Sequence, residues 1–487
     1  MPEAGPEPSR GEPAPPAASG RGEPVSPPGT PLAWRVITLA VLLGGLALGA
    51  VAAGGGGAIW LVVGSIIVVG ASLAPIIVAS RRPPIPPEPL PAVPLPGMPV
   101  VTVVIAARDE AAVLPRLIED LAAQDHRDRD GSPRFEIIVV DDRSVDGTGE
   151  AALAAAARLG LRDAVRVIRR EGPGLRDGKG AALAAASPDL YRGSMVVALD
   201  ADARVGPTFV RQIAAYAARG VPALTARRRL LGAGESQLAG AQADEQTQDG
   251  ELQRGRWATD GCSEFRGNGT TISRDLLVAV GGWPADALTE DLDLSSRVVA
   301  ATGVTVAWAL DLEVWEEPVR TWAELWRQRQ RWSEGAMRRY LEHGSAVLRS
   351  PRVPFRARLD FAAYGAQLAV PPIIIGGVLA AAATGAAGMA LALAATYLAA
   401  GGILAFDALR WEATASGPVP PPARLGRAIR AALFGFVWLG AVPAAMLRLA
   451  TRRGHVRYDK MTHVGSDGDP GPQPHGAAHA EGGPGER

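Results

Sequence analysis

Two aspartates, Asp200 and Asp202, come directly after the short apolar run Met195–Leu199. An apolar run with two adjacent valines is typical of a strand that is buried on both faces of a sheet. Residues two apart in an extended chain point to the same side, so both carboxylates would leave the carboxyl edge of the sheet together. Paired carboxylates suit a hard divalent cation that also binds phosphate oxygens. The alternative is an acidic turn after a strand.

Two further acidic motifs stand where a strand ends or a helix begins. Phe135–Val140 is an apolar run that leads into Asp141 and Asp142, and Thr289-Glu290-Asp291 precedes a helical pattern. Because Asp, Ser and Thr favour helix N-caps, both motifs have a purely structural interpretation. In the chemical interpretation, Asp291 is a general base that takes a proton from a hydroxyl group.

Two basic motifs accompany the acidic ones, and the first of them could bring a cation to a phosphate. Gly178-Lys179-Gly180 precedes the alanine-rich stretch Ala181–Ala186, near a predicted helix N-terminus, although it lacks the spacing of a P-loop. Gln328, Arg331 and Trp332 belong to a basic, tryptophan-rich segment that predicts an amphipathic helix. That segment also fits a helix at a membrane interface, where Trp and Arg partition.

The elements that would position these residues alternate between strand and helix. Apolar runs predict strands at Val100–Ala106, Phe135–Val140, Ala164–Ile168 and Met195–Leu199, with helical patterns between them. This order predicts an α/β fold, with a mostly parallel sheet and helices on both faces. Ligands of such sheets bind beyond the carboxyl ends of the strands, where the aspartates fall. No G-x-G-x-x-G follows the first run, which argues against a dinucleotide-binding dehydrogenase.

Long uncharged apolar runs flank this region. Residues 36–51 and 59–78 predict a transmembrane hairpin, and residues 361–383, 386–409 and 431–449 predict two to three further spans. Basic residues border the hairpin on both sides, so the positive-inside rule places both of its ends in the cytoplasm. A full fifth crossing would put Arg452 and Arg453 outside, against that rule. Either the last segment does not fully cross, or the charge bias is overridden.

Composition narrows the class of protein. The 487 residues carry no net charge, so nothing suggests a nucleic-acid partner, and the single cysteine, Cys262, rules out a disulfide framework. Proline, glycine and alanine dominate both ends, which predicts disorder there. We divide the chain into a disordered tail at 1–30, a transmembrane hairpin at 31–82, a cytoplasmic catalytic domain at 83–350 with an interfacial helix near 320–345, a membrane region at 351–463 and a disordered tail at 464–487.

The order of these motifs resembles that of the membrane-embedded family 2 glycosyltransferases, the group that contains cellulose, hyaluronan and poly-N-acetylglucosamine synthases. The resemblance rests on V-V-I-A-A-R-D-E at 103–110, V-V-D-D-R-S-V-D-G-T at 139–148, D-A-D at 200–202, T-E-D at 289–291 and Q-R-Q-R-W at 328–332. It covers roughly residues 99–340 and the flanking membrane segments. The fold that it implies is the GT-A-like form of the α/β sheet.

The resemblance also implies a role for each motif. The donor-binding residues would be Glu110, Asp141, Asp142, Lys179, Asp200, Gln328 and Arg331. Asp200 and Asp202 would hold Mg²⁺ or Mn²⁺ on the donor diphosphate. Asp291 would be the catalytic base, and Glu290 and Trp332 would contact the acceptor. Arg143, where many relatives carry glycine, and the Ala106-Ala107 pair depart from the family pattern, so the donor sugar stays open.

We therefore expect a metal-dependent, inverting hexosyltransferase that spans the plasma membrane several times and uses a nucleotide-sugar, most simply a UDP-sugar, on its cytoplasmic side. We expect its acceptor to be a growing polysaccharide, because the Q-x-x-R-W box suits stepwise extension. The alternative is the transfer of one sugar to a lipid, which the few C-terminal spans allow. The intact acidic motifs argue against a third possibility, an inactive membrane scaffold.

Overall fold

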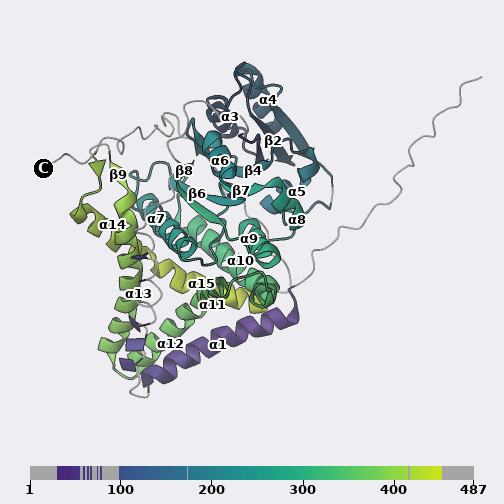
Figure 1. The fold of residues 1–487 in the computed structure, drawn as a ribbon. Coiled ribbons are helices and arrows are strands. Elements are labelled where there is room, and N and C mark those ends of the chain that lie inside the picture. The colour runs from purple at the N-terminus through teal and green to yellow at the C-terminus, as the bar shows by residue number, and fades with distance from the viewer. Residues whose placement is uncertain are drawn as a thin grey trace, which may run out of the picture.

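The computed structural model describes residues 30–54, 98–172, 174–414 and 417–451, together with scattered residues between 59 and 78. Almost all of the two predicted tails, and most of the apolar run at 59–78, lie outside these described residues. A mixed sheet covered by helices forms one half of the molecule, and long apolar helices form the other (Figure 1). We call these the catalytic half (residues 98–350) and the apolar half (residues 30–54 and 351–451).

Eight strands form the sheet of the catalytic half, in the order β3-β2-β1-β4-β7-β6-β8-β5. The strands are β1 (Val101–Ala107), β2 (Phe135–Asp142), β3 (Val165–Arg170), β4 (Met195–Asp200), β5 (Arg204–Val205), β6 (Ala223–Leu230), β7 (Thr270–Ser273) and β8 (Ala307–Glu316). The first four pair in parallel, whereas β7 is antiparallel to both β4 and β6. The predicted α/β sheet with helices on both faces is confirmed, and its parallel part comprises β1 to β4 together with the β6–β8 pair.

The two faces of the sheet explain why the predicted strands are continuous apolar runs. Val103 and Ile105 of β1 belong to one hydrophobic core and Val104 to a second core on the other side. The strand register places Ala106 beside Asp200 and Ala107 beside Asp141. The carboxyl ends of β1, β2 and β4 therefore meet at one edge of the sheet, and the acidic motifs lie at that edge.

Helices cover both faces and extend toward the apolar half. Those of the catalytic half are α3 (Leu114–Ala122), α4 (Thr148–Arg158), α5 (Lys179–Ala185), α6 (Phe209–Ala218), α7 (Gln237–Ala258), α8 (Arg274–Ala279), α9 (Glu290–Thr302) and α10 (Trp322–Arg349). The two longest, α7 and α10, lie between the sheet and the apolar helices (Figure 1). They form the junction between the two halves.

Four stretches of the described residues are long and apolar enough to cross a membrane: Leu32–Ala53, Phe355–Ala383, Ala390–Trp411 and Pro421–Thr451. Their helices are α1 (Leu32–Gly54), α11 (Phe355–Ala366), α12 (Val370–Ala383), α13 (Ala387–Ala408), α14 (Pro421–Phe434) and α15 (Phe436–Thr451), and the short strands β9 (Ala413–Thr414) and β10 (Gly417–Pro418) join α13 to α14. Glycines bring α1 and α12 together, because a Cβ on Gly49 would lie 2.0 Å from the Ile373 carbonyl oxygen. Small residues at a helix crossing permit this close backbone approach.

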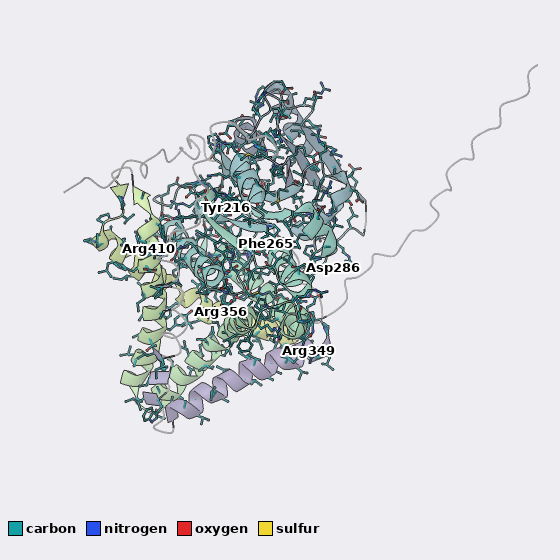
Figure 2. The ribbon with its side chains drawn as sticks, in the orientation of Figure 1. Tyr216, Phe265, Asp286, Arg349, Arg356 and Arg410 are labelled. Atoms are coloured by element: carbon teal, nitrogen blue, oxygen red, sulfur yellow. The ribbon has the colours of Figure 1, made fainter. Side chains whose placement is uncertain are left out.

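Ion pairs fasten α13 and α14 to the catalytic half. Asp244 of α7 is fully buried, and Arg427 and Arg430 of α14 donate to it at 2.7 and 2.8 Å. Arg410, which follows α13, lies near the boundary between the halves and pairs with Glu251 of α7 at 2.8 Å (Figure 2). A buried carboxylate that loses its cation is strongly destabilising, so these pairs fix α14 against α7.

The last helix, α15, contacts the catalytic half near both of its ends. Near its start, the indole Nε1 of Trp438 donates to Glu245 of α7 at 2.5 Å. Near its end, Arg448 pairs with Glu334 of α10 at 3.0 Å. Helix α15 therefore runs along the catalytic half rather than away from it.

Candidate active site

One cavity of about 880 Å³ follows the carboxyl edge of the sheet and continues past α10 between the apolar helices. Every residue that the sequence predicts for the site lines this cavity except Asp141. The lining residues among them are Glu110, Asp142, Lys179, Asp200, Asp202, Glu290, Asp291, Gln328, Arg331 and Trp332. Motifs that are far apart in the sequence thus surround one space.

Asp200 and Asp202 both line the cavity, as their spacing predicts. Asp200 ends β4, and its backbone N–H donates to Oδ1 of Asn268 at 3.1 Å. The Oδ2 of Asp202 accepts the backbone N–H of Glu317 at 3.3 Å. Two carboxylates beside one cavity form a hard oxygen donor set, which fits Mg²⁺ or Mn²⁺ shared with a diphosphate.

Lys179, the first residue of α5, joins two acidic motifs. Its Nζ lies 2.5 Å from Oδ1 of Asp200 and 3.4 Å from Oε1 of Glu290. Burial lowers the pKa of Lys179, but the charges of these two carboxylates outweigh that effect and raise the pKa above its ordinary value. Position 180 must be glycine for this approach, since a Cβ there would lie 2.2 Å from the Pro284 carbonyl oxygen. A charged ammonium group thus lies where the two acidic motifs converge.

Asp291 lies in the first turn of α9 and faces the loop at Gly267, whose Cβ position is 3.7 Å from Oδ2 of Asp291. Burial and, after it, the charge of Glu290 raise the pKa of Asp291 to about 7, against the opposing charges of Arg266 and Lys179. A carboxyl group with a pKa near neutrality is suited to accept a proton at physiological pH.

The structural interpretation of the T-E-D motif, helix capping, does not account for Thr289. Its side chain makes no capping hydrogen bond to α9. It packs against α10 instead, where a Cβ on Gly335 would lie 2.3 Å from Cγ2 of Thr289. This close approach of α9 and α10 brings Asp291 to the same cavity as the Q-x-x-R-W residues.

Trp332 of the Q-x-x-R-W box is held by neighbours from two helices, α10 and α15. The Arg329 guanidinium lies 4.3 Å from the centroid of the Trp332 ring, and the Trp438 ring stacks at 6.5 Å with an interplanar angle of 24°. Arg329 is itself buried and pairs with Glu245. The indole of Trp332 therefore has a fixed orientation in the cavity wall.

Asp142 lines the cavity with its charge already paired. Arg143 donates to both oxygens of Asp142, at 2.9 and 3.1 Å, and Arg170 lies 2.8 Å from Oδ1. Arg143 has a φ of +59°, in the left-handed region that favours glycine. Glycine adopts this conformation readily, which explains why it fits this position. In this chain the ion pair with Asp142 holds Arg143 in the same conformation. Nearby, the backbone N–H of Glu110 donates to Oγ1 of Thr148 at 2.8 Å.

Asp141, in contrast, is turned away from the cavity. Successive strand residues point to opposite faces, so the strand that presents Asp142 buries Asp141. Its Oδ1 accepts the backbone N–H of Ser144 at 3.1 Å, and Gly149 leaves room for its Oδ2. We propose that Asp141 supports the loop after β2, in place of the donor contact expected from the sequence.

Several residues that sequence reasoning missed also line the cavity. Arg266 donates to Asp249 at 2.7 Å and to the Tyr364 hydroxyl at 2.9 Å, and so links the F-R-G-N-G loop, α7 and α11. Helix α7 adds Glu245, Gln246, Gln248 and Asp249 to the lining. The glycines at 267 and 269 indicate a loop after Arg266, but nothing in the sequence places that loop at the site. Helix α7 mixes polar, small and apolar residues without an amphipathic pattern, so nothing in its sequence distinguished its cavity side.

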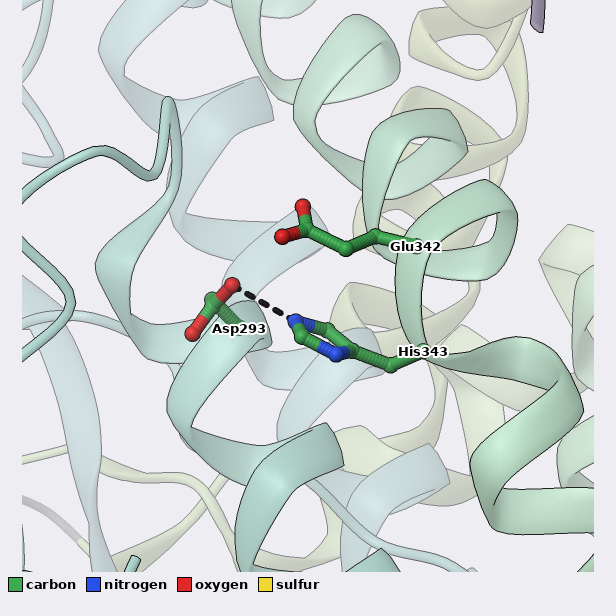
Figure 3. Close-up of side chains that lie close together, drawn as sticks. All are labelled: Asp293, Glu342 and His343. Carbon is green, nitrogen blue, oxygen red and sulfur yellow. Dashed lines mark hydrogen bonds and ion pairs between the residues drawn. The ribbon is translucent and has the colours of Figure 1, made fainter. Parts of the chain in front are cut away.

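A second cluster of possible metal ligands lies on α9 and α10, outside the cavity lining. Ligand atoms of Asp293, Glu342 and His343 lie within 4.8 Å of one another (Figure 3). Asp293 is already paired, because Nε2 of His343 and Nε of Arg297 each lie 2.7 Å from one of its oxygens. Burial alone would raise the pKa of Asp293, but these partners hold it below its ordinary value. We interpret the Asp293–His343 bond as a clamp between α9 and α10.

Comparison with known proteins gives a consistent family. The family described as "Glycosyltransferase like family 2" matches residues 96–335. The chain is 31% identical over 372 residues to a beta-monoglucosyldiacylglycerol synthase of Synechocystis sp., and the match covers 74% of each protein. It is also 31% identical over 255 residues to a Nostoc sp. protein of the same name, where the match spans 51% of this chain and 52% of the relative.

The fold has a solved counterpart as well. The structure of mannosyltransferase PcManGT from Pyrobaculum calidifontis in complex with GDP-Man and Mn²⁺ has a TM-score of 0.52 to this chain at 21% sequence identity. The superposition covers 85% of this chain and 98% of that one. The similarity in fold therefore extends over most of both chains.

Proposed function

Since this chain belongs to glycosyltransferase family 2, we propose that it transfers one hexosyl group from a nucleotide-sugar to the free hydroxyl of a diacylglycerol. One observation carries the proposal. The cavity that holds the acidic motifs continues without interruption between the apolar helices, so a membrane lipid and a soluble nucleotide-sugar can reach the same carboxylate.

The choice of acceptor corrects the expectation from the sequence. We expected polysaccharide extension and kept transfer to a lipid as the alternative. The relatives named beta-monoglucosyldiacylglycerol synthase favour that alternative. A lipid acceptor also suits an apolar cavity wall, since sugar polymers need hydrogen-bonding walls along their path.

The proposed mechanism uses the geometry at Asp291. The carboxylate of Asp291 takes the proton from the acceptor hydroxyl, whose oxygen attacks the anomeric carbon while the bond to the diphosphate breaks. Lys179 and Arg331 stabilise the charge that grows on the leaving group. Asp200 and Asp202 would hold the divalent cation, which would supply further positive charge to the diphosphate. Inversion follows from a single displacement, and it converts an α-linked donor into the β-linkage that the relatives' name specifies.

We also propose a placement in the membrane. The catalytic half faces the cytoplasm. Basic residues stand next to the apolar runs of the chain, and the positive-inside rule assigns such residues to the cytoplasmic side. Helix α15 lies along the membrane surface, because Trp438 and Arg448 contact α7 and α10 of the catalytic half. With α15 at the surface, the chain makes no full fifth crossing, which is the first of the two possibilities that the positive-inside rule leaves open.

The test is a direct product analysis. Purified protein in nanodiscs that contain diacylglycerol is incubated with radiolabelled UDP-glucose, UDP-galactose, UDP-N-acetylglucosamine or GDP-mannose, and the lipid extract is analysed by chromatography and mass spectrometry. Asp291→Asn protein is the inactive control. One nucleotide-sugar should yield a lipid that carries a single β-linked sugar. A water-soluble polymer, or no transfer to lipid from any donor, would contradict the proposal.

A further inference from the structure

The part of the cavity beyond α10 has walls of a different chemistry from those of the donor site. Apolar and small side chains from α12, α13, α14 and α15 line it, together with residues just before α12. These residues are Leu368, Val370, Pro371, Ala400, Gly401, Leu404, Ala431, Ala432, Gly435 and Val442. We call this part the apolar chamber. It opens among the helices that are long and apolar enough to cross a membrane.

Polar groups mark the border between the apolar chamber and the catalytic site. Gln248 of α7 reaches the chamber wall, where its Nε2 lies 3.7 Å from the Cβ position of Gly401. Arg339 of α10 lines the same cavity and is 3% exposed. Its Nη2 is engaged by Glu264 and Tyr340, but its Nε and Nη1 have no hydrogen-bond partner among the described residues.

Because Nε and Nη1 of Arg339 are themselves buried, a ligand oxygen in the cavity meets the partly exposed amide of Gln248 instead. The cavity thus offers a proton acceptor at Asp291, an amide donor at Gln248 and an apolar wall. That combination of groups matches a molecule with a hydroxyl group, ester carbonyls and hydrocarbon chains.

We propose that the apolar chamber is the binding site for the acyl chains of the acceptor lipid. The lipid enters sideways from the membrane and places its chains beside Gly401 and Leu404 of α13. An ester carbonyl of the lipid accepts a hydrogen bond from the side-chain amide of Gln248, and the free hydroxyl of the lipid reaches Asp291. This inference rests on the proposed transfer to diacylglycerol and adds where, and through which residues, that acceptor is held.

Gly401 allows the chamber to be filled without disturbing the donor site. A Cβ added there would meet its nearest atoms only at 3.7 and 3.9 Å, so the backbone tolerates a side chain at this position of the chamber wall, and the longer side chain of leucine would take up space in the chamber. Gly388, on the same helix but outside the cavity lining, provides the matched control, because a Cβ there meets nothing within 4 Å. We therefore compare Gly401→Leu with Gly388→Leu in nanodiscs.

Two measurements test the proposal. The first is kcat/KM for dioleoylglycerol, measured together with donor hydrolysis in vesicles that lack diacylglycerol. Gly401→Leu should lower kcat/KM about tenfold or more, while donor hydrolysis and donor affinity stay within twofold of the parent. The second is cross-linking by a diacylglycerol with a photoactivatable acyl chain, mapped by mass spectrometry. The parent and Gly388→Leu should be labelled on α13 or α15, and Gly401→Leu should lose that label.

The outcomes separate this inference from the proposed function. If the parent labels at α13 or α15 but transfers no sugar to lipid, the chamber stands as a lipid site and the proposed reaction fails. If the parent glycosylates diacylglycerol, yet Gly401→Leu behaves like Gly388→Leu and the label maps elsewhere, the reaction stands and the chamber is not the acceptor site.

Discussion

The ammonium group of Lys179 lies 2.5 Å from the carboxylate of Asp200, so a cation on α5 is bonded to the aspartate that ends β4. The two residues come from separate elements, and only the fold brings them together. Their contact joins the Gly-Lys-Gly loop to the D-x-D motif, and it places a fixed positive charge at the position proposed for the donor diphosphate.

Lys179→Met should lower kcat by about 10² to 10³-fold, the usual loss when one group that stabilises transition-state charge is removed. Glycosyl transfer under saturating donor gives the measurement. Arg176→Met is the matched control, because Arg176 is half-exposed, pairs with Asp286 and does not line the cavity. Equal activity of the two variants would show that Lys179 has no part in the reaction.

The pH profile should report Asp291. Its pKa is raised to about 7, so the carboxyl is protonated and cannot accept a proton below that pH. We expect log kcat/KM to rise with unit slope up to about pH 7 and then to level off. Glu290→Gln removes a like charge, which should move the rising limb to lower pH, whereas Asp286→Asn, outside the cavity, should leave it in place. If Glu290→Gln leaves the rising limb of the pH profile in place, the charge of Glu290 does not raise the pKa of Asp291.

The contact between Thr289 and Gly335 should be sensitive to a single methyl group. Gly335→Ala would place its Cβ 2.3 Å from the threonine, and overpacking of this kind destabilises a protein by about 1 to 3 kcal/mol. Gly344→Ala on the same helix meets nothing within 4 Å and should stabilise the protein by up to about 1 kcal/mol. Thermal unfolding in detergent, measured together with kcat, distinguishes the two variants. Identical melting temperatures would contradict the packing of Thr289 against Gly335.

Metal removal should stop the reaction reversibly. EDTA should abolish transfer, and Mn²⁺ or Mg²⁺ should restore it, because Asp200 and Asp202 present carboxylate oxygens beside the proposed diphosphate site. Asp202→Asn should lose activity while its thermal unfolding stays close to that of the parent. The exposed residue Asp163 supplies the control variant Asp163→Asn, which should respond to metal as the parent does. Full activity in EDTA would exclude the metal.

The sequence predicted those parts of the site whose geometry is local. Asp200 and Asp202 both lie at the cavity, although only Asp200 belongs to β4 and Asp202 follows in a turn. The apolar runs placed β1, β2 and β4 because burial on two faces leaves a continuous signal. The strand repeat separates Asp141 from Asp142. Both residues are buried, and a family motif that names both did not distinguish Asp142, which lines the cavity, from Asp141, which does not.

Long-range packing left weaker signals. The polar helix α7 contributes Gln248 and Asp249 to the cavity, but its orientation depends on the buried pairs of Asp244 with arginines more than 180 residues away. The direction of α15 is likewise set by contacts of Trp438 and Arg448 with the catalytic half. An apolar run alone indicates a possible membrane span, and these contacts decide where the helix lies.

The most direct test of the account is the comparison of Asp291→Asn with the parent in turnover, donor affinity and thermal stability. The substitution keeps the size of the side chain and removes its basicity. If Asp291 is the base, kcat for glycosylation of diacylglycerol should fall by about 10² to 10⁴-fold, while the Kd of the nucleotide-sugar and the melting temperature stay near those of the parent. Turnover within a few fold of the parent would contradict the mechanism, because the acceptor proton would then have to go to another group.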